Sequence, residues 1–278
     1  MNSAQVDAYL SRLGVRPPAW PTIDVLRELQ LRHLQTVPFE NLAIHLGEEI
    51  VLEEKRLLDK VVGARRGGFC YELNGAFGAL LAALGYDVSL LAGRGHTEEG
   101  RLGIPYDHLA LRVRTVDAGE WLADVGFGAL SHYPLVFEEG HEQEDPGGAF
   151  RIIQVRPEPP GTRGPGTPDV DLVRDGRPVY RLETRPRALG DFVAGAWWHT
   201  TSPQSHFVQS LVCSRLTEDG GRITLSGRQL KVTAPDGTRD ARELETDEEV
   251  LAVYRERFGI VLDRVPVVRG SGGGGGAS

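Results

Sequence analysis

The sequence predicts an α+β fold in which helices come first, then antiparallel strands, then a mixed unit. Over roughly the first 85 residues, apolar side chains recur at the spacing of amphipathic helices. From residue 86 the period falls toward two, as in half-buried strands, and strand patterns near the C-terminus give way to one more helical pattern. We therefore expect a helical bundle over 1–85, a small β-barrel or curled sheet over 86–194, an α/β unit over 195–265 and a flexible Gly-rich tail over 266–278.

The helical unit should contain four helices. The segments VDAYLSRL, IDVLRELQLRHL and EKRLLDKVV each carry apolar residues on one helical face, and Thr22 is placed to cap the second. A fourth helix should begin near Gly68 and end at Gly85, so that Cys70 lies in its first turn. Its apolar stripe would consist of Leu73, Phe77, Leu80, Leu81 and Leu84.

Alternating apolar residues predict strands in DVSLLAG, HLALRVRT, WLADVGF and FRIIQVR. The segment VDLVRDGRPVYRL carries Asp175-Gly176 at the centre of an expected hairpin. Further strands are expected in HFVQSLVCSRL and RITLSGRQLKVT. The segment TDEEVLAVYRERFG has a capping-box start at Thr246 and a glycine stop at Gly259, which predicts a final helix.

Composition argues against several classes of partner. With 278 residues, 40% of them hydrophobic, and a formal net charge of -8, the chain can bury a sizeable core but has no basic footprint for nucleic acid. The sequence has no signal-peptide pattern and no stretch of about 18 apolar residues, so we expect a cytoplasmic protein without a membrane partner. Two widely separated cysteines, Cys70 and Cys213, suggest neither a disulfide framework nor a metal site, and Cys213 is expected to be inert core.

The densest chemical signal is RRGGFCYELN, residues 65–74, in which two glycines precede a cysteine at a predicted helix start. Backbone amides and the helix dipole at such a position favour a thiolate over a thiol. Arg65 and Arg66 could add to that field. The same pattern would also fit a small buried hydrophobe, which is the commoner fate of a free cysteine.

A thiolate nucleophile needs a proton partner, and that partner needs a group that holds its tautomer. In PYDHLALRV, His108 opens an apolar strand and could point toward a cleft, although an ordinary edge histidine fits the pattern equally well. In WLADVGFG, Asp124 lies inside an apolar strand, where a carboxylate is costly unless it is paired. Asp107 adjoins His108, but neighbouring strand residues face opposite sides, so Asp107 is the weaker candidate for orienting the ring.

Taken together, these motifs resemble the arylamine N-acetyltransferase family. RGGFCYELN is similar to the family's cysteine motif, VPFENL at 37–42 to its N-terminal signature, DVGFG to its aspartate segment and SPQSHFV at 202–208 to the segment that opens its third domain. The resemblance covers roughly residues 5–262. It implies a helical bundle, a β-barrel and an α/β lid around a cysteine-protease-like core, with Cys70 as nucleophile, His108 as its base and Asp124 as the orienting carboxylate.

The resemblance also implies a reaction and its substrates. An acyl group moves from acetyl-CoA, the co-substrate, to the cysteine and then to an arylamine or arylhydrazine nitrogen, in a ping-pong cycle without a metal. Three residues correspond to the family's aryl pocket, namely Phe39, Phe127 and Phe207. Five correspond to positions near coenzyme A, namely Gly126, Gly128, Ser202, Gln204 and Ser205. Ordinary core packing would explain Phe39 and Phe207 about equally well, and a strand-ending turn would explain the two glycines equally well.

Three other functions share parts of this pattern. An amide synthase of the ansamycin type resembles the same family and closes a macrolactam from a carrier-bound polyketide, and nothing in the sequence decides against it. A papain-like or transglutaminase-like hydrolase also uses Cys and His with Asp or Asn. The VPFENL segment and the length of the resemblance count against that hydrolase. A binding protein on an inactive transferase scaffold should have a broken triad, whereas all three residues are present.

Overall fold

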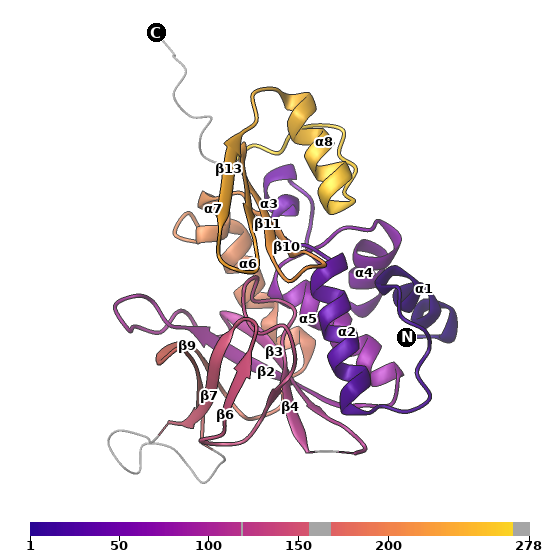
Figure 1. Ribbon diagram of the computed structural model, residues 1–278, viewed down its shortest axis with the longest axis vertical. Helices are drawn as coiled ribbons and strands as arrows, with labels where there is room; N and C mark the ends of the chain where they lie inside the picture. Colours follow the sequence, from indigo (N-terminus) through magenta and orange to yellow (C-terminus); the bar gives the residue numbers. More distant parts are fainter. Residues whose placement is uncertain (118, 156–167, 269–278) are drawn as a thin grey trace.

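The computed structural model describes residues 1–117, 119–155 and 168–268. Its elements form three groups in the order of the sequence, namely helices, a curled eight-stranded antiparallel sheet, and a five-stranded sheet with a helix beside it (Figure 1). The predicted α+β fold is therefore confirmed. Among the described residues, no helix combines the length and the apolar character needed to cross a membrane.

The N-terminal helices are α1 Ser3–Leu13, α2 Ile23–Thr36, α3 Leu42–Leu46, α4 Glu54–Leu58 and α5 Cys70–Ala83, with a π-helical turn at Asp59–Gly63. α1 starts with a capping box between Asn2 and Gln5 and ends at Gly14, whose φ of 69° lies in the left-handed region that favours glycine. α2 starts directly after Thr22 as predicted, although the Thr22 side chain makes no cap hydrogen bond.

The curled sheet has the strand order β5-β4-β3-β2-β9-β8-β7-β6. Its strands are β2 Asp87–Gly95, β3 His108–Arg114, β4 Glu120–Ala123, β5 Leu135–Val136, β6 Glu142–Asp145, β7 Gly148–Gln154, β8 Val170–Arg174 and β9 Arg177–Leu182. The Gln143 side chain joins the two edge strands, because its amide bonds the backbone N–H and C=O of Val136 at 2.7 and 3.2 Å. The sheet is therefore nearly closed into a barrel. The predicted hairpin turns at Asp175 and Gly176, both with positive φ.

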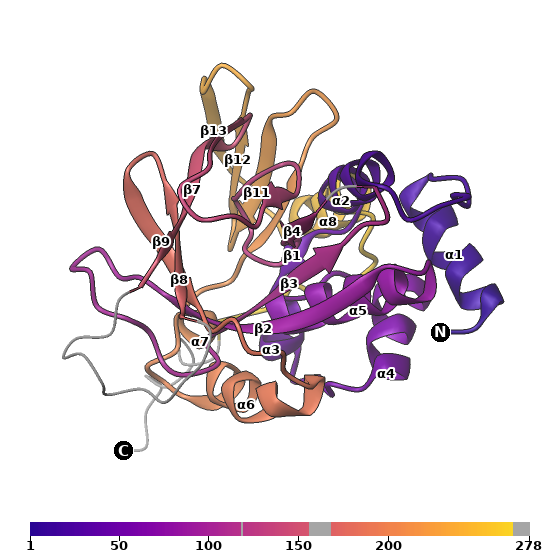
Figure 2. The ribbon, with the colours of Figure 1, turned by 90° about the horizontal axis from the view of Figure 1, so that it is seen from below.

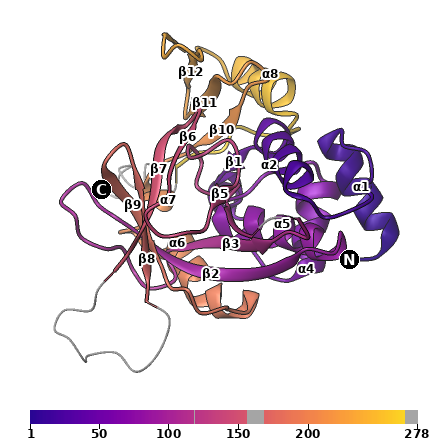
Figure 3. The same cartoon turned by 60° about the horizontal axis from the view of Figure 1, so that its bottom comes forward.

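α5 is the central helix of the molecule. It packs against α1 and α4 on one side and against β2 and β3 on the other (Figure 3). The predicted single apolar stripe is therefore too narrow a description, since nearly the whole first two turns and most of the rest of α5 are buried. The strands β7, β8 and β9 lie on the side of the molecule away from α1 and α4 (Figure 2). Because α5 separates bundle from barrel, a side chain at its start can contact both.

The C-terminal sheet contains β10 Cys213–Leu216, β11 Arg222–Ser226, β12 Gln229–Thr233 and β13 Arg239–Glu243. Its other edge is β1 Phe39–Glu40, which comes from the N-terminal region and pairs antiparallel with β10. The final helix, α8 Asp247–Phe258, has the predicted Thr246 capping box and ends at Gly259 with φ 69°. The connection from the barrel contains a 3-10 turn Leu189–Phe192, α6 Val193–Thr201 and α7 His206–Gln209.

Two predicted strands are wrong in part. HFVQSLVCSRL begins as the helix α7, because the Ser205 hydroxyl accepts the N–H of Phe207 and caps a helical turn, and only its end forms β10. WLADVGF leaves the strand at Ala123, because the Asp124 carboxylate accepts the N–H of Gly126 in an Asx turn. The domain boundaries at 85, 194 and 265 stay a prediction. Residues 269–278 of the predicted tail lie outside the described residues.

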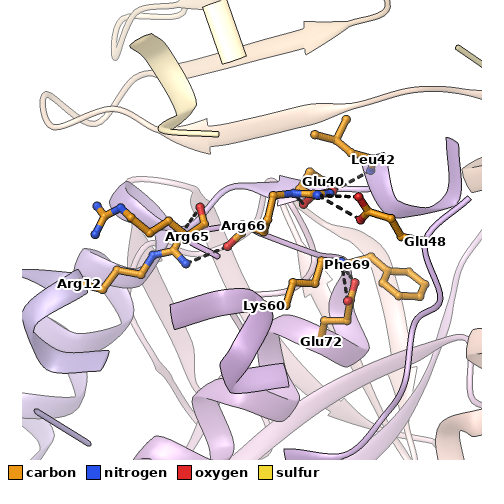
Figure 4. Close-up of polar contacts among 9 residues, drawn as sticks. All are labelled: Arg12, Glu40, Leu42, Glu48, Lys60, Arg65, Arg66, Phe69 and Glu72. Carbon is orange, nitrogen blue, oxygen red and sulfur yellow. Dashed lines mark hydrogen bonds and ion pairs between the residues drawn. The ribbon is translucent and has the colours of Figure 1, made fainter. Parts of the chain in front are cut away.

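A band of buried charge surrounds the segment that leads into α5 (Figure 4). Arg66 donates to Glu40 at 3.0 Å and to Glu48 at 3.1 Å, while Lys60 pairs with Glu72 at 2.6 Å. Glu40 is almost fully buried, and burial alone would raise its pKa, but the positive charges of Lys60 and Arg66 lower it. Arg12 donates to the backbone oxygen of Arg66 at 2.9 Å. These contacts fix the backbone immediately before Cys70.

We expect Arg66→Met to destabilise the fold by about 3–5 kcal/mol, because it leaves the Glu40 carboxylate buried without its main counter-charge. The measurement is urea unfolding followed by circular dichroism. The double variant Glu40→Leu/Arg66→Met should be more stable than Arg66→Met alone, because the buried carboxylate is removed with its partner and Glu48, the other partner of Arg66, is half-exposed. Arg114→Met removes an exposed arginine from its ion pairs and should leave the midpoint nearly unchanged. Equal effects of Arg66→Met and Arg114→Met would contradict this account.

Candidate active site

Cys70 is the first residue of α5 and is buried. Neither of the two glycines before it has room for a side chain, since a Cβ on Gly67 would lie 1.9 Å from the backbone oxygen of Pro38. A Cβ on Gly68 would likewise meet the Glu72 side chain at 2.6 Å. The helix start that carries the thiol is therefore packed tightly against the backbone of Pro38 and the side chain of Glu72.

His108 and Asp124 lie against each other, as the sequence suggested. His108 opens β3, Asp124 follows the last residue of β4, and their Nε2 and Oδ2 atoms are 2.7 Å apart. His108 lies opposite Gly93 in the sheet, and a Cβ on that glycine would come within 3.1 Å of the His108 Cβ. The absence of a side chain at Gly93 leaves room for the imidazole. Cys70 and His108 line the same cleft, and Cys70 is one of the groups that raise the pKa of the His108 imidazole.

The Asp124 carboxylate has three further donors. Asn74 Nδ2 and the Gly126 amide donate to Oδ1 at 2.8 and 2.9 Å, and the Tyr180 hydroxyl donates to Oδ2 at 3.1 Å. Asn74 lies one helical turn after Cys70, so its spacing in FCYELN places it on the same face of α5. This spacing could have identified Asn74 as a site residue from the sequence. Tyr180 comes from β9 and carries no such signal. Neither Asn74 nor Tyr180 is among the site residues predicted from the sequence.

Burial and pairing act on the two ionisable groups in opposite directions. Burial by itself would raise the pKa of Asp124, but the positive charge and hydrogen bond of His108, with those from Asn74 and Gly126, lower it. Burial disfavours the His108 cation, but the Asp124 charge and hydrogen bond, together with Cys70, raise its pKa to about 10. The imidazole beside Cys70 is therefore a cation at neutral pH.

A cleft of about 280 Å³ opens beside these residues. Its walls are Phe39, Cys70, Gly95, Asp107, His108, Gly126, Phe127 and Phe207. The three predicted aryl-pocket residues therefore all lie at the cleft. The Phe127 ring lies edge-on to His108, with ring centres 5.2 Å apart, and the Phe39 and Phe207 rings are 6.1 Å apart. Flat apolar walls next to a nucleophile suit an aromatic ligand.

Packing and backbone conformation explain why glycine stands at the two positions predicted near coenzyme A. A Cβ on Gly126 would lie 2.7 Å from the Cα of Cys70, so the turn after β4 packs directly on the start of α5. Gly128 has a φ of 86°, which other residues rarely adopt, and it faces the ring of Phe39. Gly126 lines the cleft and Gly128 does not belong to its walls. A contact of either glycine with coenzyme A stays a prediction.

The three polar residues predicted near coenzyme A lie around the connection between α6 and α7. Ser205 is fully buried, and its hydroxyl donates to the backbone oxygen of His199 at 2.9 Å while it accepts the Phe207 amide. Ser202 caps the turn by accepting the Gln204 amide at 3.3 Å. None of Ser202, Gln204 and Ser205 belongs to the cleft walls. Their contact with coenzyme A stays a prediction.

A second His–Asp pair lies close to the first. Asp107 Oδ1 accepts from Nε2 of His199 at 2.9 Å. The backbone oxygen of Asp107 lies 4.0 Å from Sγ of Cys70 and accepts the Tyr71 hydroxyl at 3.1 Å. The carboxylate of Asp107 is thus directed to α6 and not to the His108 ring, in agreement with the alternation of side chains along a strand. Among the residues that the structure describes, no three His, Cys, Asp or Glu side chains are grouped to hold a metal ion.

The N-acetyltransferase family profile matches residues 22–267 of the chain. Escherichia coli arylamine N-acetyltransferase is 32% identical over 256 residues, which cover 92% of this chain and 88% of the relative. The structure of arylamine N-acetyltransferase from Salmonella typhimurium superposes with a TM-score of 0.82 at 31% identity, covering 94% of this chain and 92% of that one. The Mycobacterium marinum arylamine N-acetyltransferase in complex with CoA gives 0.78 at 33% identity, covering 92% of each chain.

The profile match spans most of the chain, and named enzymes above 30% identity share both its sequence and its fold. The chain therefore belongs to the arylamine N-acetyltransferase family and is an acetyltransferase enzyme.

Proposed function

We propose that the protein transfers an acetyl group from acetyl-CoA to the nitrogen of an arylamine or arylhydrazine through a thioester on Cys70. The observation that carries this proposal is the junction of Cys70, His108 and Asp124, from three separate elements, at a cleft with aromatic walls. The Mycobacterium marinum relative has been solved as a complex with CoA, which supports coenzyme A as the acyl carrier here.

In the first half-reaction, Sγ of Cys70 attacks the carbonyl carbon of the acetyl thioester. A new carbon–sulfur bond forms to Cys70 while the bond to the coenzyme sulfur breaks, and the two thioesters are similar in energy. His108 is held as a cation by Asp124, which bonds its Nε2, so the proton on Nδ1 can pass to the departing thiolate. Asp124 keeps the ring oriented throughout and stabilises its positive charge.

In the second half-reaction, the acceptor nitrogen attacks the acetyl carbon on Cys70, the bond to Sγ breaks and an amide forms. His108, now neutral, takes the proton that the nitrogen loses. Cys70 is one of the groups that raise the pKa of His108, so acylation of Cys70 should lower that pKa and help to keep the imidazole neutral until it takes this proton. Amide formation makes this step favourable.

The cleft favours a small aromatic acceptor. Phe39, Phe127 and Phe207 offer ring faces and edges close to Cys70, and the volume of about 280 Å³ suits a ligand of one ring better than a carrier-bound polyketide. This size supports the arylamine or arylhydrazine acceptor over the macrolactam-forming alternative.

Intact-protein mass spectrometry after mixing with acetyl-CoA tests the proposed intermediate. We expect one acetyl adduct on the wild type, its discharge on adding an arylamine, and no adduct on Cys70→Ala. Cys213→Ala is the matched control and should acquire the adduct normally, because Cys213 is fully buried and burial raises the pKa of its thiol well above the usual range. An adduct on Cys70→Ala, or none on the folded wild type, would contradict the proposal.

Asp124→Asn tests the role of the buried carboxylate. It keeps the size of the side chain but removes the charge that raises the pKa of His108, so kcat/KM for acetyl transfer should fall by at least about a thousandfold. Tyr180→Phe removes only one of the donors to Asp124, and we expect it to lower kcat/KM by no more than about tenfold. If Asp124→Asn is folded and retains activity close to that of Tyr180→Phe, the assigned role of Asp124 is wrong.

A further inference from the structure

Asp107 is the acidic residue among those that line the cleft, and its carboxylate bonds the amide of another lining residue, Gly95. Asp107 precedes His108 in the chain, and its side chain is 21% exposed. The described residues that form the cleft walls include Asp107 but no lysine or arginine. A molecule bound beside Cys70 therefore meets a negative side chain and no positive one contributed by the walls, apart from the His108 that the proposed reaction itself uses.

Two donors fix the Asp107 carboxylate in this position. The amide of Gly95, the last residue of β2, donates to Oδ2 at 2.9 Å, and Nε2 of His199 on α6 donates to Oδ1 at 2.9 Å. Burial alone would raise the pKa of Asp107, but the hydrogen bonds from His199 and from Gly95 lower it below its usual range. A neutral imidazole with its proton on Nε2 is enough to make the His199 bond. The carboxylate is therefore ionised at neutral pH and has little freedom to turn away.

The proposed acetyl transfer does not need this charge. Asp124 already orients His108, and the Asp107 carboxylate oxygens are directed to β2 and α6. The acceptor ring, however, must share a cleft of about 280 Å³ with that carboxylate. Charges in a partly buried cleft are weakly screened, so a like charge on the acceptor would be disfavoured. Selectivity often comes from such an unfavourable contact with the wrong ligand.

We propose that Asp107 determines acceptor specificity, so that the site disfavours arylamines that carry a carboxylate and accepts those with neutral or cationic ring substituents. This inference rests on the proposed acetyl transfer and specifies its acceptor class.

A series of three acceptors of similar shape tests the inference. 4-Aminobenzoate is an anion, 4-aminobenzamide is neutral and 4-aminobenzamidine is a cation. For the wild type with acetyl-CoA, kcat/KM for the amide should exceed that for the acid by about tenfold or more, and the amidine should be at least as good as the amide. In Asp107→Asn the amide-to-acid ratio should fall by about fivefold or more. Comparing ratios between the two proteins cancels differences in the nucleophilicity of the three amines.

The chain offers a matched control. Asp171 on β8 is also paired with a histidine, His96, at 3.2 Å, and it lies outside the cleft walls. Asp171 also pairs with Arg181 at 2.9 Å, so Asp171→Asn removes a histidine-paired carboxylate away from the cleft and should leave all three ratios unchanged.

Several results would overturn the inference. One is a wild type that prefers the acid, and another is Asp107→Asn that changes all three acceptors by the same factor, which would indicate a purely structural role. If Asp107→Asn does not fold, His199→Gln replaces it, because it keeps the carboxylate and should still discriminate against the acid. Equal rates for acid and amide in that variant would count against the inference. If no acceptor is acetylated and no adduct forms on Cys70, the proposed function itself fails, and the inference fails with it.

Discussion

A carboxylate buried in a protein is costly unless other groups compensate its charge, and this requirement at Asp124 holds the two halves of the site together. Its partners come from different parts of the fold, namely Asn74 on α5, His108 on β3, Tyr180 on β9 and the amide of Gly126 in its own turn. The helical bundle and the barrel satisfy this charge only when they dock in one relative arrangement. The same arrangement places the His108 ring beside the start of α5, where the reactive thiol lies.

Close backbone approach completes the site. The turn that contains Gly126 packs on the Cα of Cys70, and Gly67 allows the preceding segment to pass the backbone of Pro38. The ion pairs of Arg66 with Glu40 and Glu48 hold that same segment. The glycines flanking the nucleophile are thus explained by packing around Cys70 itself. A contact with coenzyme A is not needed to account for them, although it is compatible with the position of Gly126 at the cleft.

The sequence predicted the elements whose hydrophobic period is strong, and its motifs identified the three residues that the structure brings together. Predictions from the sequence failed where a local hydrogen bond decides the backbone conformation, or where a strand is exposed on both faces and shows no alternation. Ser205 caps a helical turn at 206–209 in a segment that alternates like a strand, and Arg239–Glu243 forms an edge strand whose residues are all exposed, so no alternation marks it. Tyr180 lies 56 residues from Asp124 in the chain, and the two meet because the sheet curls, which no local sequence pattern predicts. Asn74, in contrast, could have been predicted, because it lies four residues after Cys70 and therefore on the same face of the helix.

The central claim is that the buried Asp124 keeps His108 as a cation beside Cys70. Nitrogen NMR of protein carrying isotope-labelled histidine measures this directly, with His108→Gln to assign the signal. We expect both ring nitrogens of His108 to be protonated at neutral pH and the signal to titrate with a pKa of about 10. A signal that is neutral at pH 7 and titrates near the ordinary histidine value of about 6.5 would contradict it.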